Sequence, residues 1–168
     1  MRNHRHPRAP VPSRTASERP ALTEITATAQ INASPQRVWA ILTDVASYPE
    51  WNPLFRQASG QLTAGSTVTL QTVRPGTKRV MTVKVKILAA EPAAQLSWVS
   101  SLPGIITGEH SFTLTPADGG TRLVQTETYG GLLGRMSAKS ISRTKASFEA
   151  LNQAIKQRAE HDQQPTPE

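Results

Sequence analysis

The sequence predicts an α+β domain, in which a curved, antiparallel, seven-stranded sheet wraps around a long C-terminal helix, with two short helices between strands 1 and 2. Three observations lead to this prediction. Residues 54–129 hold consecutive strand-like segments joined by short links of turn-forming residues. One more strand-like segment precedes them, and one long amphipathic segment follows. Strands linked in this way form an antiparallel meander, and the long helix is the only large element able to cover its inner face.

The composition is typical of one soluble domain. The chain has 168 residues, 37% of them hydrophobic, and a mean hydropathy of -0.39. No segment is apolar enough to span a membrane, and the N-terminus lacks the apolar core of a secretory signal, so we expect a cytoplasmic protein. The absence of cysteine excludes disulfides, thiolate metal sites and cysteine nucleophiles.

Both ends of the chain differ in composition from its centre. Residues 1–23 hold several prolines and five arginines against one glutamate, so they carry +4 of the net charge of +7. We expect a disordered basic tail there, with contact to nucleic acid or anionic lipid as the alternative. Residues 161–168 are polar and form a second expected tail. The folded domain is therefore expected to span residues 24–160.

The first two elements follow directly from hydrophobic patterning. Apolar and polar residues alternate over residues 25–31, which indicates a half-buried strand. A helix is predicted next, because Ser34 is a favourable N-cap and Pro35 is tolerated in a first turn. Its apolar face is made by residues with helical spacing, Val38, Ile41 and Leu42.

The segment TDVASYPEWNP, residues 43–53, gathers stiff and bulky residues in a chain that is poor in aromatics. We predict a short second helix over residues 44–50, which Pro49 and Pro53 stop. Asp44 is expected to accept hydrogen bonds from backbone N–H groups at its start. Tyr48 and Trp51 then project from a stiff corner, as a core plug or as the rim of a pocket.

The strands of the meander have predicted limits and registers. The predicted strands are residues 54–59, 67–74, 77–90, 94–101, 107–116 and 121–129. A two-residue turn at Pro75 and Gly76 would set Val68 opposite Val83 and Leu70 opposite Met81. The link over residues 91–94 would set Ile87 opposite Trp98 and Ala89 opposite Leu96.

The last predicted hairpin brings polar residues to the inner face of the sheet. The turn at Asp118 and Gly119 sets three pairs face to face: Leu114 with Leu123, Phe112 with Gln125, and His110 with Glu127. The leucines and Phe112 mark this side as inward, so the polar members point inward too. Buried polar groups need partners. His110 and Glu127 form a structural pair, contribute to a pocket, or transfer protons in catalysis; the pattern leaves these alternatives open.

Residues 133–160 read as a long helix. Ile141, Phe148, Leu151 and Ile155 lie at helical spacing, joined by Met136, Thr144 and Asn152. The basic residues of this segment fill its outer face and are interpreted as solvated: Lys139, Arg143, Lys145, Lys156 and Arg158.

Three segments of the chain together resemble the START-like, polyketide cyclase/dehydrase and lipid-transport superfamily, often called SRPBCC. They are the helix SPQRVWAILTDVASYPEWNP, the hairpin GEHSFTLTPADGGTRLVQTETYGGLL and the terminal helix. The resemblance covers about residues 24–160 and is to small bacterial members. It implies a helix-grip fold that encloses a cavity between sheet and helix. Members bind lipids, sterols, hormones, polyketides or quinones, some catalyse cyclisation or dehydration, and others assist chaperones, so the fold alone does not determine the chemistry.

In such a fold the candidate residues for binding a ligand are the inward-facing ones: Trp51, Phe55, Leu70, Met81, Val83, Trp98, His110, Phe112, Gln125, Glu127, Met136 and Ser140. Taken singly, most of these residues are better explained as ordinary core. Taken together, the mix of aromatics, methionine and a few inward polar groups suits a mostly apolar pocket. The segment SLPGIITG resembles the mobile gate of the superfamily, so the expected gate residues are Leu102, Pro103, Gly104, Ile105 and Ile106. A simple strand connection is the alternative.

Three classes of function follow. The leading hypothesis is a module that binds a small hydrophobic or amphipathic molecule, such as a lipid, polyketide or quinone, in an internal cavity. The second is a cyclase or dehydratase that uses His110 and Glu127 as acid and base. The third is a protein-interaction or chaperone-cofactor module. We expect no cofactor, no metal and no specific nucleic-acid partner, and motifs for acyl, phosphoryl or hydride transfer are absent from the sequence.

Overall fold

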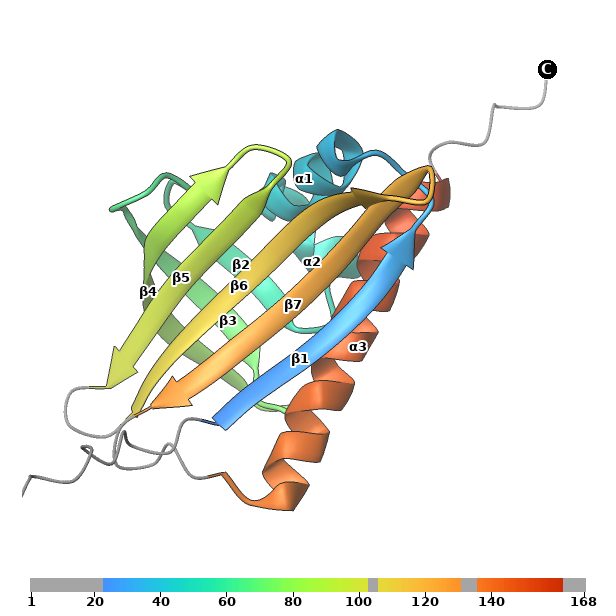
Figure 1. Cartoon of the computed structure of the whole chain (residues 1–168). Helices are drawn as coiled ribbons and strands as arrows, with labels where there is room; N and C mark the ends of the chain where they lie inside the picture. Colours follow the sequence, from blue (N-terminus) through green and yellow to red (C-terminus); the bar gives the residue numbers. More distant parts are fainter. Residues whose placement is uncertain (1–22, 103–105, 131–135, 162–168) are drawn as a thin grey trace, which may run out of the picture.

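In the computed structural model, which describes residues 23–102, 106–130 and 136–161, a seven-stranded antiparallel sheet curves around one long helix (Figure 1). The strand order is β1-β7-β6-β5-β4-β3-β2, so the first strand pairs with the last. The strands are β1 (Thr23–Ile31), β2 (Phe55–Ser59), β3 (Thr67–Val73), β4 (Val80–Glu91), β5 (Gln95–Leu102), β6 (Ile106–Ala117) and β7 (Gly120–Gly130). This confirms the predicted fold class.

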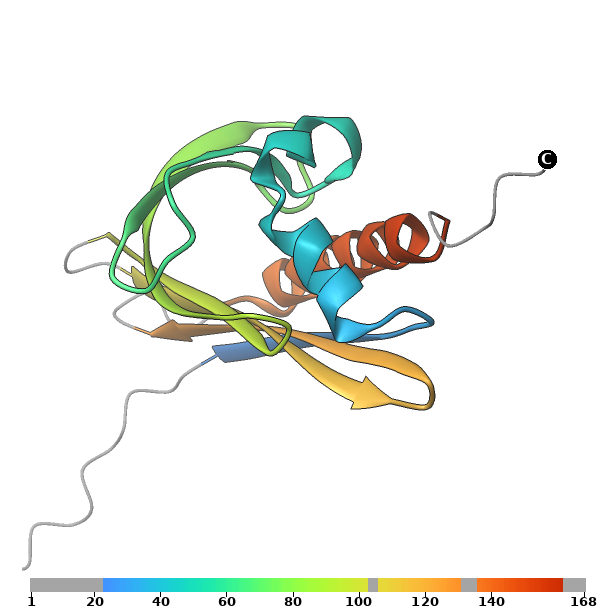
Figure 2. The ribbon, with the colours of Figure 1, turned by 90° about the horizontal axis from the view of Figure 1, so that it is seen from above.

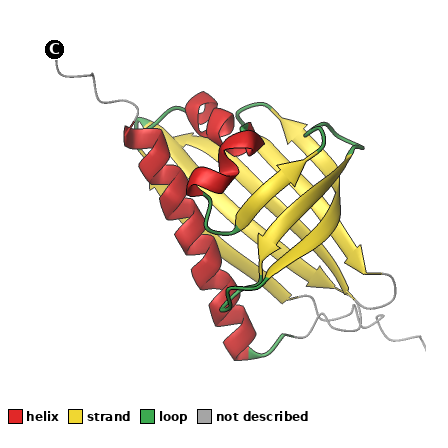
Figure 3. Cartoon of the chain, turned by 180° about the vertical axis from the view of Figure 1, so that it is seen from behind, coloured by secondary structure: helices red, strands yellow, loops and turns green. Residues whose placement is uncertain are grey.

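The helices lie on the concave side of the sheet. They are α1 (Pro35–Thr43), the short 3-10 helix η1 (Val45–Ser47), α2 (Tyr48–Trp51) and α3 (Ala138–His161). Figure 2 shows the sheet bent into an arc around α1 and α3. From behind, α3 runs diagonally along the sheet while α1 and α2 sit together at one end (Figure 3). The opposite end carries the β3–β4 hairpin.

The core forms between α3 and the inner face of the sheet. Phe148, Leu151 and Ile155 of α3 are almost completely buried, as their spacing predicted. They meet the alternating apolar residues of β1, of which Ile25 and Ile31 are also buried. Burying a large apolar side chain contributes roughly 1.5–3 kcal/mol, so this face holds the helix on the sheet.

Helix α1 begins as predicted. The Ser34 side chain accepts a hydrogen bond from the Arg37 N–H at 3.3 Å, and Pro35 occupies the first turn. Val38, Ile41 and Leu42 are buried against the core. Helix α3 begins at Ala138 rather than near residue 133, with Ser137 accepting from the Ser140 N–H; residues 131–135 lie outside the described part of the chain.

The predictions for residues 44–53 need two corrections. Pro49 lies in the first turn of α2, where a missing N–H is harmless, so it helps to start this helix rather than to stop it. The Asp44 side chain makes no capping hydrogen bond. The side chain with such a role is Asn52, whose Oδ1 accepts from the N–H groups of Leu54 at 3.0 Å and Phe55 at 2.7 Å. Asn52 therefore directs the chain from α2 into β2.

The predicted register of β3 and β4 was wrong by two residues. Leu70 lies opposite Val83, and Met81 lies opposite Thr72. Pro75 and Gly76 do form a turn, since the Thr77 N–H donates to the Arg74 carbonyl, but the strands first pair beyond it, where the Arg74 N–H donates to the Arg79 carbonyl. The loop thus has two more residues than expected. A shift of two keeps each side chain on its predicted face.

The other two hairpins were predicted better. Ile87 lies opposite Trp98 as expected, but Leu96 pairs with Ala90 instead of Ala89, because an irregularity between Ile87 and Ala89 inserts one residue. The last hairpin has the predicted register throughout: Leu114 with Leu123, Phe112 with Gln125, and His110 with Glu127.

Candidate functional site

A cavity of about 430 Å³ lies between the inner face of the sheet and α3. Its walls are mainly apolar and include Leu54, Phe55, Leu70, Val83, Val85, Trp98 and Phe148. Its polar lining residues include Thr72, Ser100, His110, Glu127, Tyr129 and Thr144. Arg74, Pro75 and Met81 form its outer end, and Met81 is 43% exposed, so the cavity reaches the surface there.

Two small residues in one row of the sheet create this space. Ser100 of β5 pairs with Gly108 of β6, which pairs with Tyr129 of β7. A side chain at position 108 would begin 3.2 Å from Glu127 Oε1 and 3.4 Å from Ser100 Oγ. Because a glycine stands there, the volume that a larger side chain would fill stays open. The next row, of Trp98, His110 and Glu127, forms the inner end of the cavity.

His110 is held rigidly by aromatic rings. The residue is 4% exposed. Its ring stacks on that of Trp98, with ring centroids 4.8 Å apart and an interplanar angle of 1°. Phe112, Phe148 and Phe55 pack against it at centroid distances of 5.0, 5.1 and 6.0 Å. These contacts leave the imidazole little freedom to rotate.

Both ring nitrogens of His110 have neighbours. Nδ1 lies 3.5 Å from Glu127 Oε2, and Nε2 lies 3.1 Å from the amide nitrogen of Gln125. An amide nitrogen can only donate, so in this arrangement Nε2 accepts and the ring proton on Nδ1 faces the carboxylate. The Gln125 Oε1 atom is buried and has no hydrogen-bond partner in the described part of the protein.

Tyr129 completes the polar cluster. Its hydroxyl donates to Glu127 Oε2 at 2.6 Å. Burial, and secondly the neighbouring negative charge of Glu127, raise the pKa of Tyr129 well above its ordinary value. The hydroxyl therefore stays a neutral donor. Glu127 Oε2 serves both Tyr129 and His110, whereas no hydrogen bond to Oε1 is found among the described residues.

The predicted binding residues fall into two groups. Those that line the cavity are Phe55, Leu70, Met81, Val83, Trp98, His110 and Glu127. The others do not line it: Phe112 and Gln125 are buried one row deeper, Met136 packs against the core, and Ser140 is exposed. The indole Nε1–H of Trp51 donates to Ser47 Oγ, and the guanidinium of Arg158 lies 5.8 Å from the Trp51 ring centre, on the outside.

The expected gate falls at the edge of what the structure describes. Pro103, Gly104 and Ile105 lie outside the described residues, and the flanking Leu102 and Ile106 belong to the ends of β5 and β6. The gate therefore stays a prediction. The described residues contain no helix that is both long and apolar enough to cross a membrane, and no cluster of three or more histidine, aspartate or glutamate residues suited to a metal ion.

Several lining residues were not among the predicted ones. Tyr129 and Gly108 could have been found, since the register that pairs His110 with Glu127 also pairs these two on the same face. Ser100 lies on the same face as the predicted Trp98, two residues further on, but its pairing with Gly108 was not predicted, because the connection between these two strands fits several loop lengths. Thr144 was predicted only as part of the helix face, and Arg74 only as the end of a strand.

The comparisons with known proteins agree with this architecture. A family model described as polyketide cyclase/dehydrase and lipid transport matches residues 23–160. No curated protein sequence matches the chain. The Zhui aromatase/cyclase from Streptomyces sp. R1128 is similar in structure, with a TM-score of 0.69 and 16% identity over 86% of this chain and 97% of that one. A START superfamily protein from Mycobacterium smegmatis has a TM-score of 0.65 and 16% identity over 83% and 97%.

Proposed function

The chain belongs to the polyketide cyclase/dehydrase and lipid-transport family, and on that premise we propose that it binds a small hydrophobic or amphipathic molecule in the cavity between sheet and α3. The observation that carries this proposal is the cavity itself. At about 430 Å³ it falls in the range of roughly 300–1,000 Å³ that small-molecule sites occupy. Its mostly apolar wall with one polar cluster is typical of such sites.

The polar cluster supports a ligand with one polar group at its inner end. Glu127 Oε1 is the acceptor that the cluster leaves unused, and Tyr129 and His110 hold the other oxygen of the same carboxylate. A ligand hydroxyl or N–H that reached this atom would gain a charge-assisted hydrogen bond. Molecules without such a donor would leave a half-buried carboxylate without solvent, so they would bind less well.

The acid–base alternative is supported less well for His110 than the sequence suggested. Its two ring nitrogens face Gln125 and Glu127, so neither is directed at a molecule in the cavity. If a reaction takes place here, Glu127 is the group placed to exchange a proton, and His110 positions it. The interaction-module alternative has little support, because large exposed apolar residues in the described chain are limited to Val80, Met81 and Leu88.

The proposal is tested by filling the cavity. Replacing Val83 with phenylalanine places a larger side chain in the wall, opposite Leu70. We expect binding of the fluorescent neutral probe N-phenyl-1-naphthylamine to weaken by about tenfold or more, since a clash of this size costs roughly 1–3 kcal/mol. Native mass spectrometry of the purified chain, alone and with fatty acids, fatty alcohols and polycyclic phenols, shows directly what the cavity retains.

The matched control is Lys86→Phe. Lys86 lies on the same strand, is exposed and does not line the cavity. The Lys86→Phe substitution introduces the same ring on the outer face of the sheet, so it should leave the affinity for the probe unchanged. An unmodified protein that binds neither the probe nor any compound of the panel, or a Val83→Phe variant that binds as tightly as the unmodified protein, would contradict the proposal.

A further inference from the structure

A second hollow, of about 390 Å³, adjoins the outer end of the cavity. It lies between the β3–β4 hairpin and α3, where Ser147 and Ala150 form the wall on the helix side. Leu54, Val73 and Arg74 line both spaces, so the two adjoin at these residues. We call this second hollow the basic groove, because arginine and lysine side chains line it.

The charged residues that line the basic groove are all cationic. They are Arg56, Arg74 and Lys78, and no acidic side chain of the described residues lines it. None of the three belongs to an ion pair among the residues that the structure describes. Like charges brought together in a concave site repel one another and raise the local concentration of anions. The groove is therefore suited to an anionic group.

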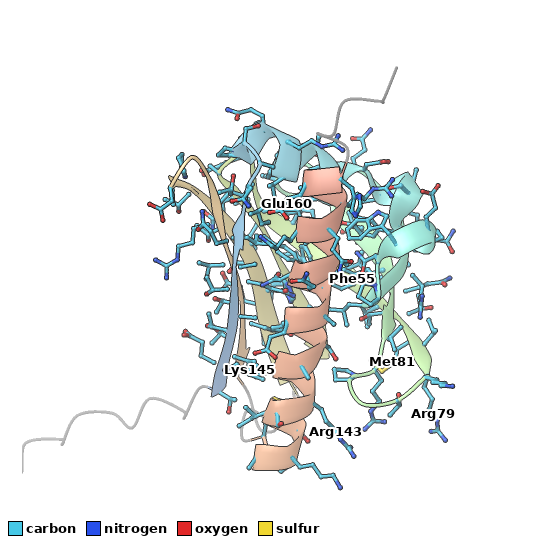
Figure 4. All side chains as sticks on the ribbon, turned by 90° about the vertical axis from the view of Figure 1, so that its right-hand side faces the viewer. Phe55, Arg79, Met81, Arg143, Lys145 and Glu160 are labelled. Carbon is cyan, nitrogen blue, oxygen red and sulfur yellow. The ribbon has the colours of Figure 1, made fainter. Side chains whose placement is uncertain are left out.

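The local backbone brings further positive charge to this place. Gly76 has a φ of +72°, which lets the hairpin turn tightly. A side chain there would begin 2.6 Å from Cδ of Arg143, so the hairpin tip rests against the stem of this arginine of α3. Figure 4 shows Arg143 on α3 and, facing it, the hairpin that carries Arg79 and Met81.

The two ends of the combined space thus differ in charge. The inner end holds the Glu127 carboxylate, which disfavours a second anion nearby, whereas the outer end opens on the basic groove. We propose that the ligand is an anionic amphiphile, whose apolar part fills the cavity and whose carboxylate or phosphate group lies in the basic groove on Arg56, Arg74 and Lys78. This inference rests on the proposed function and specifies the class of its ligand.

Matched pairs of compounds test it by isothermal titration calorimetry. 10-Hydroxydecanoate is compared with 1-decanol, and 6-hydroxy-2-naphthoate with 2-naphthol, so that each pair keeps its hydrocarbon skeleton and its hydroxyl donor and differs in the carboxylate. We expect the anion to bind about tenfold or more tightly than its neutral partner, because hydrogen bonds to charged groups contribute about 1.5–3 kcal/mol. The preference should shrink as ionic strength rises.

Two triple variants locate the effect. Arg56→Gln/Arg74→Gln/Lys78→Gln should abolish the preference for the anion while the neutral compounds bind as before. Lys86→Gln/Arg122→Gln/Lys145→Gln removes the same charge from exposed residues outside both hollows and should keep the preference. Circular dichroism melts verify that both variants fold. Inorganic phosphate should compete with the anionic compounds and not with the neutral ones.

The outcomes separate this inference from the function on which it rests. Equal affinity for both members of a pair, or a preference that survives in the groove variant, overturns the inference and leaves the hydrophobic cavity standing. Phosphate that binds the groove without displacing either carboxylate overturns it too, because the groove would then serve free anions only. If no member of either pair binds, the proposed function fails and the inference with it.

Discussion

Tyr48 and Tyr129 are the only tyrosines of the chain, and the fold shields both hydroxyls. The Tyr48 hydroxyl donates to the Leu42 carbonyl at 2.6 Å, and burial, followed by the charge of Asp44, raises its pKa. The Tyr129 hydroxyl is held by Glu127, and its pKa is raised by burial and by that carboxylate. Ionising either residue would place a negative charge in a dry site.

A spectroscopic titration follows from this. We expect the native protein to show almost no tyrosinate absorbance at 295 nm at about pH 11, a unit above the ordinary tyrosine pKa of about 10. The chain unfolded in guanidinium should show both tyrosinates at the same pH. Because the pKa values are raised in the folded state, this stabilisation is complete below pH 10 and is lost as the pH rises further.

The variants Tyr48→Phe and Tyr129→Phe assign whatever signal appears. A native titration with a midpoint near the ordinary value, of the amplitude of one tyrosine or both, would mean that the corresponding hydroxyl reaches water. The tyrosine that remains in each variant identifies which one it is.

At this scale the sequence predicted the site only where a turn determined the register. His110 and Glu127 were found because the tight turn at Asp118 and Gly119 determines which residues lie opposite each other in the last hairpin. The unused state of Glu127 Oε1, and the engagement of both His110 nitrogens, depend on side-chain positions in three dimensions. Those positions depend on Trp98, which stacks on His110 and comes from β5, a strand whose register against β6 was not predicted.

Among the elements, the C-terminal turn of α3 is tied to the end of β1. Lys156 Nζ donates to the Gln30 carbonyl and to Glu160 Oε1, both at 2.7 Å, and the Asn32 N–H donates to the same carboxylate oxygen at 2.7 Å. Figure 4 shows Glu160 at this end of α3. The hydrogen bond from Lys156, and next that from Asn32, lower the pKa of Glu160.

Replacing Glu160 with glutamine should reduce stability in a pH-dependent way. A lowered folded-state pKa means that the stabilisation is present above the ordinary value of 4.5 and is lost as the pH falls through the folded-state value. We expect a loss of about 0.5 kcal/mol at pH 7, since the site is near the surface and screened by solvent, and no difference at about pH 2. Urea melts at both pH values measure it.

Glu149→Gln is the control for this variant, because Glu149 is exposed on the same helix and belongs to no ion pair of the described residues. It should change stability little at either pH. If the Glu160 variant shows the same loss at both pH values, the carboxylate charge is not what joins α3 to β1.

At the scale of elements, the spacing of hydrophobic residues predicted correctly which segments are helices and which are strands. The turn residues predicted the strand register in the last hairpin but not in the hairpin of β3 and β4. Pro75 and Gly76 were recognised as a turn, yet pairing resumes only at Arg74 and Arg79. Thr77 explains this: its hydroxyl donates to the Arg74 carbonyl and accepts from the Arg79 N–H, which stabilises a longer loop. A threonine after a Pro-Gly pair fits several loops, so the sequence alone did not decide between them.

At the scale of the whole molecule, the open cavity lowers the free energy of unfolding. Apolar residues such as Leu70 and Phe148 contact it where they would otherwise contact other side chains. The Val83→Phe variant should therefore be more stable than the unmodified protein, by about 1 kcal/mol or a rise of about 2–4 °C in Tm, even as it loses the probe. Differential scanning calorimetry measures this, with Lys86→Phe expected to melt unchanged.

A Val83→Phe variant that melts several degrees lower would show that the wall of the cavity is already closely packed, and the loss of probe binding in that variant would then reflect damage to the fold. Filling from another wall, by Ser100→Val, distinguishes the two cases. It should also raise Tm if the space is open.

The strand order has a consequence for how the chain acquires this fold. Thr26 of β1 lies beside Thr126 of β7, 100 positions further along the sequence. At synthesis rates of about 5–20 residues per second, β1 waits roughly 5–20 seconds before its partner strand exists. During that time Ile25 and Ile31, buried in the finished protein, have no sheet to join. The pairing of β1 with β7 therefore cannot form, and the sheet cannot be complete, until most of the chain has emerged from the ribosome.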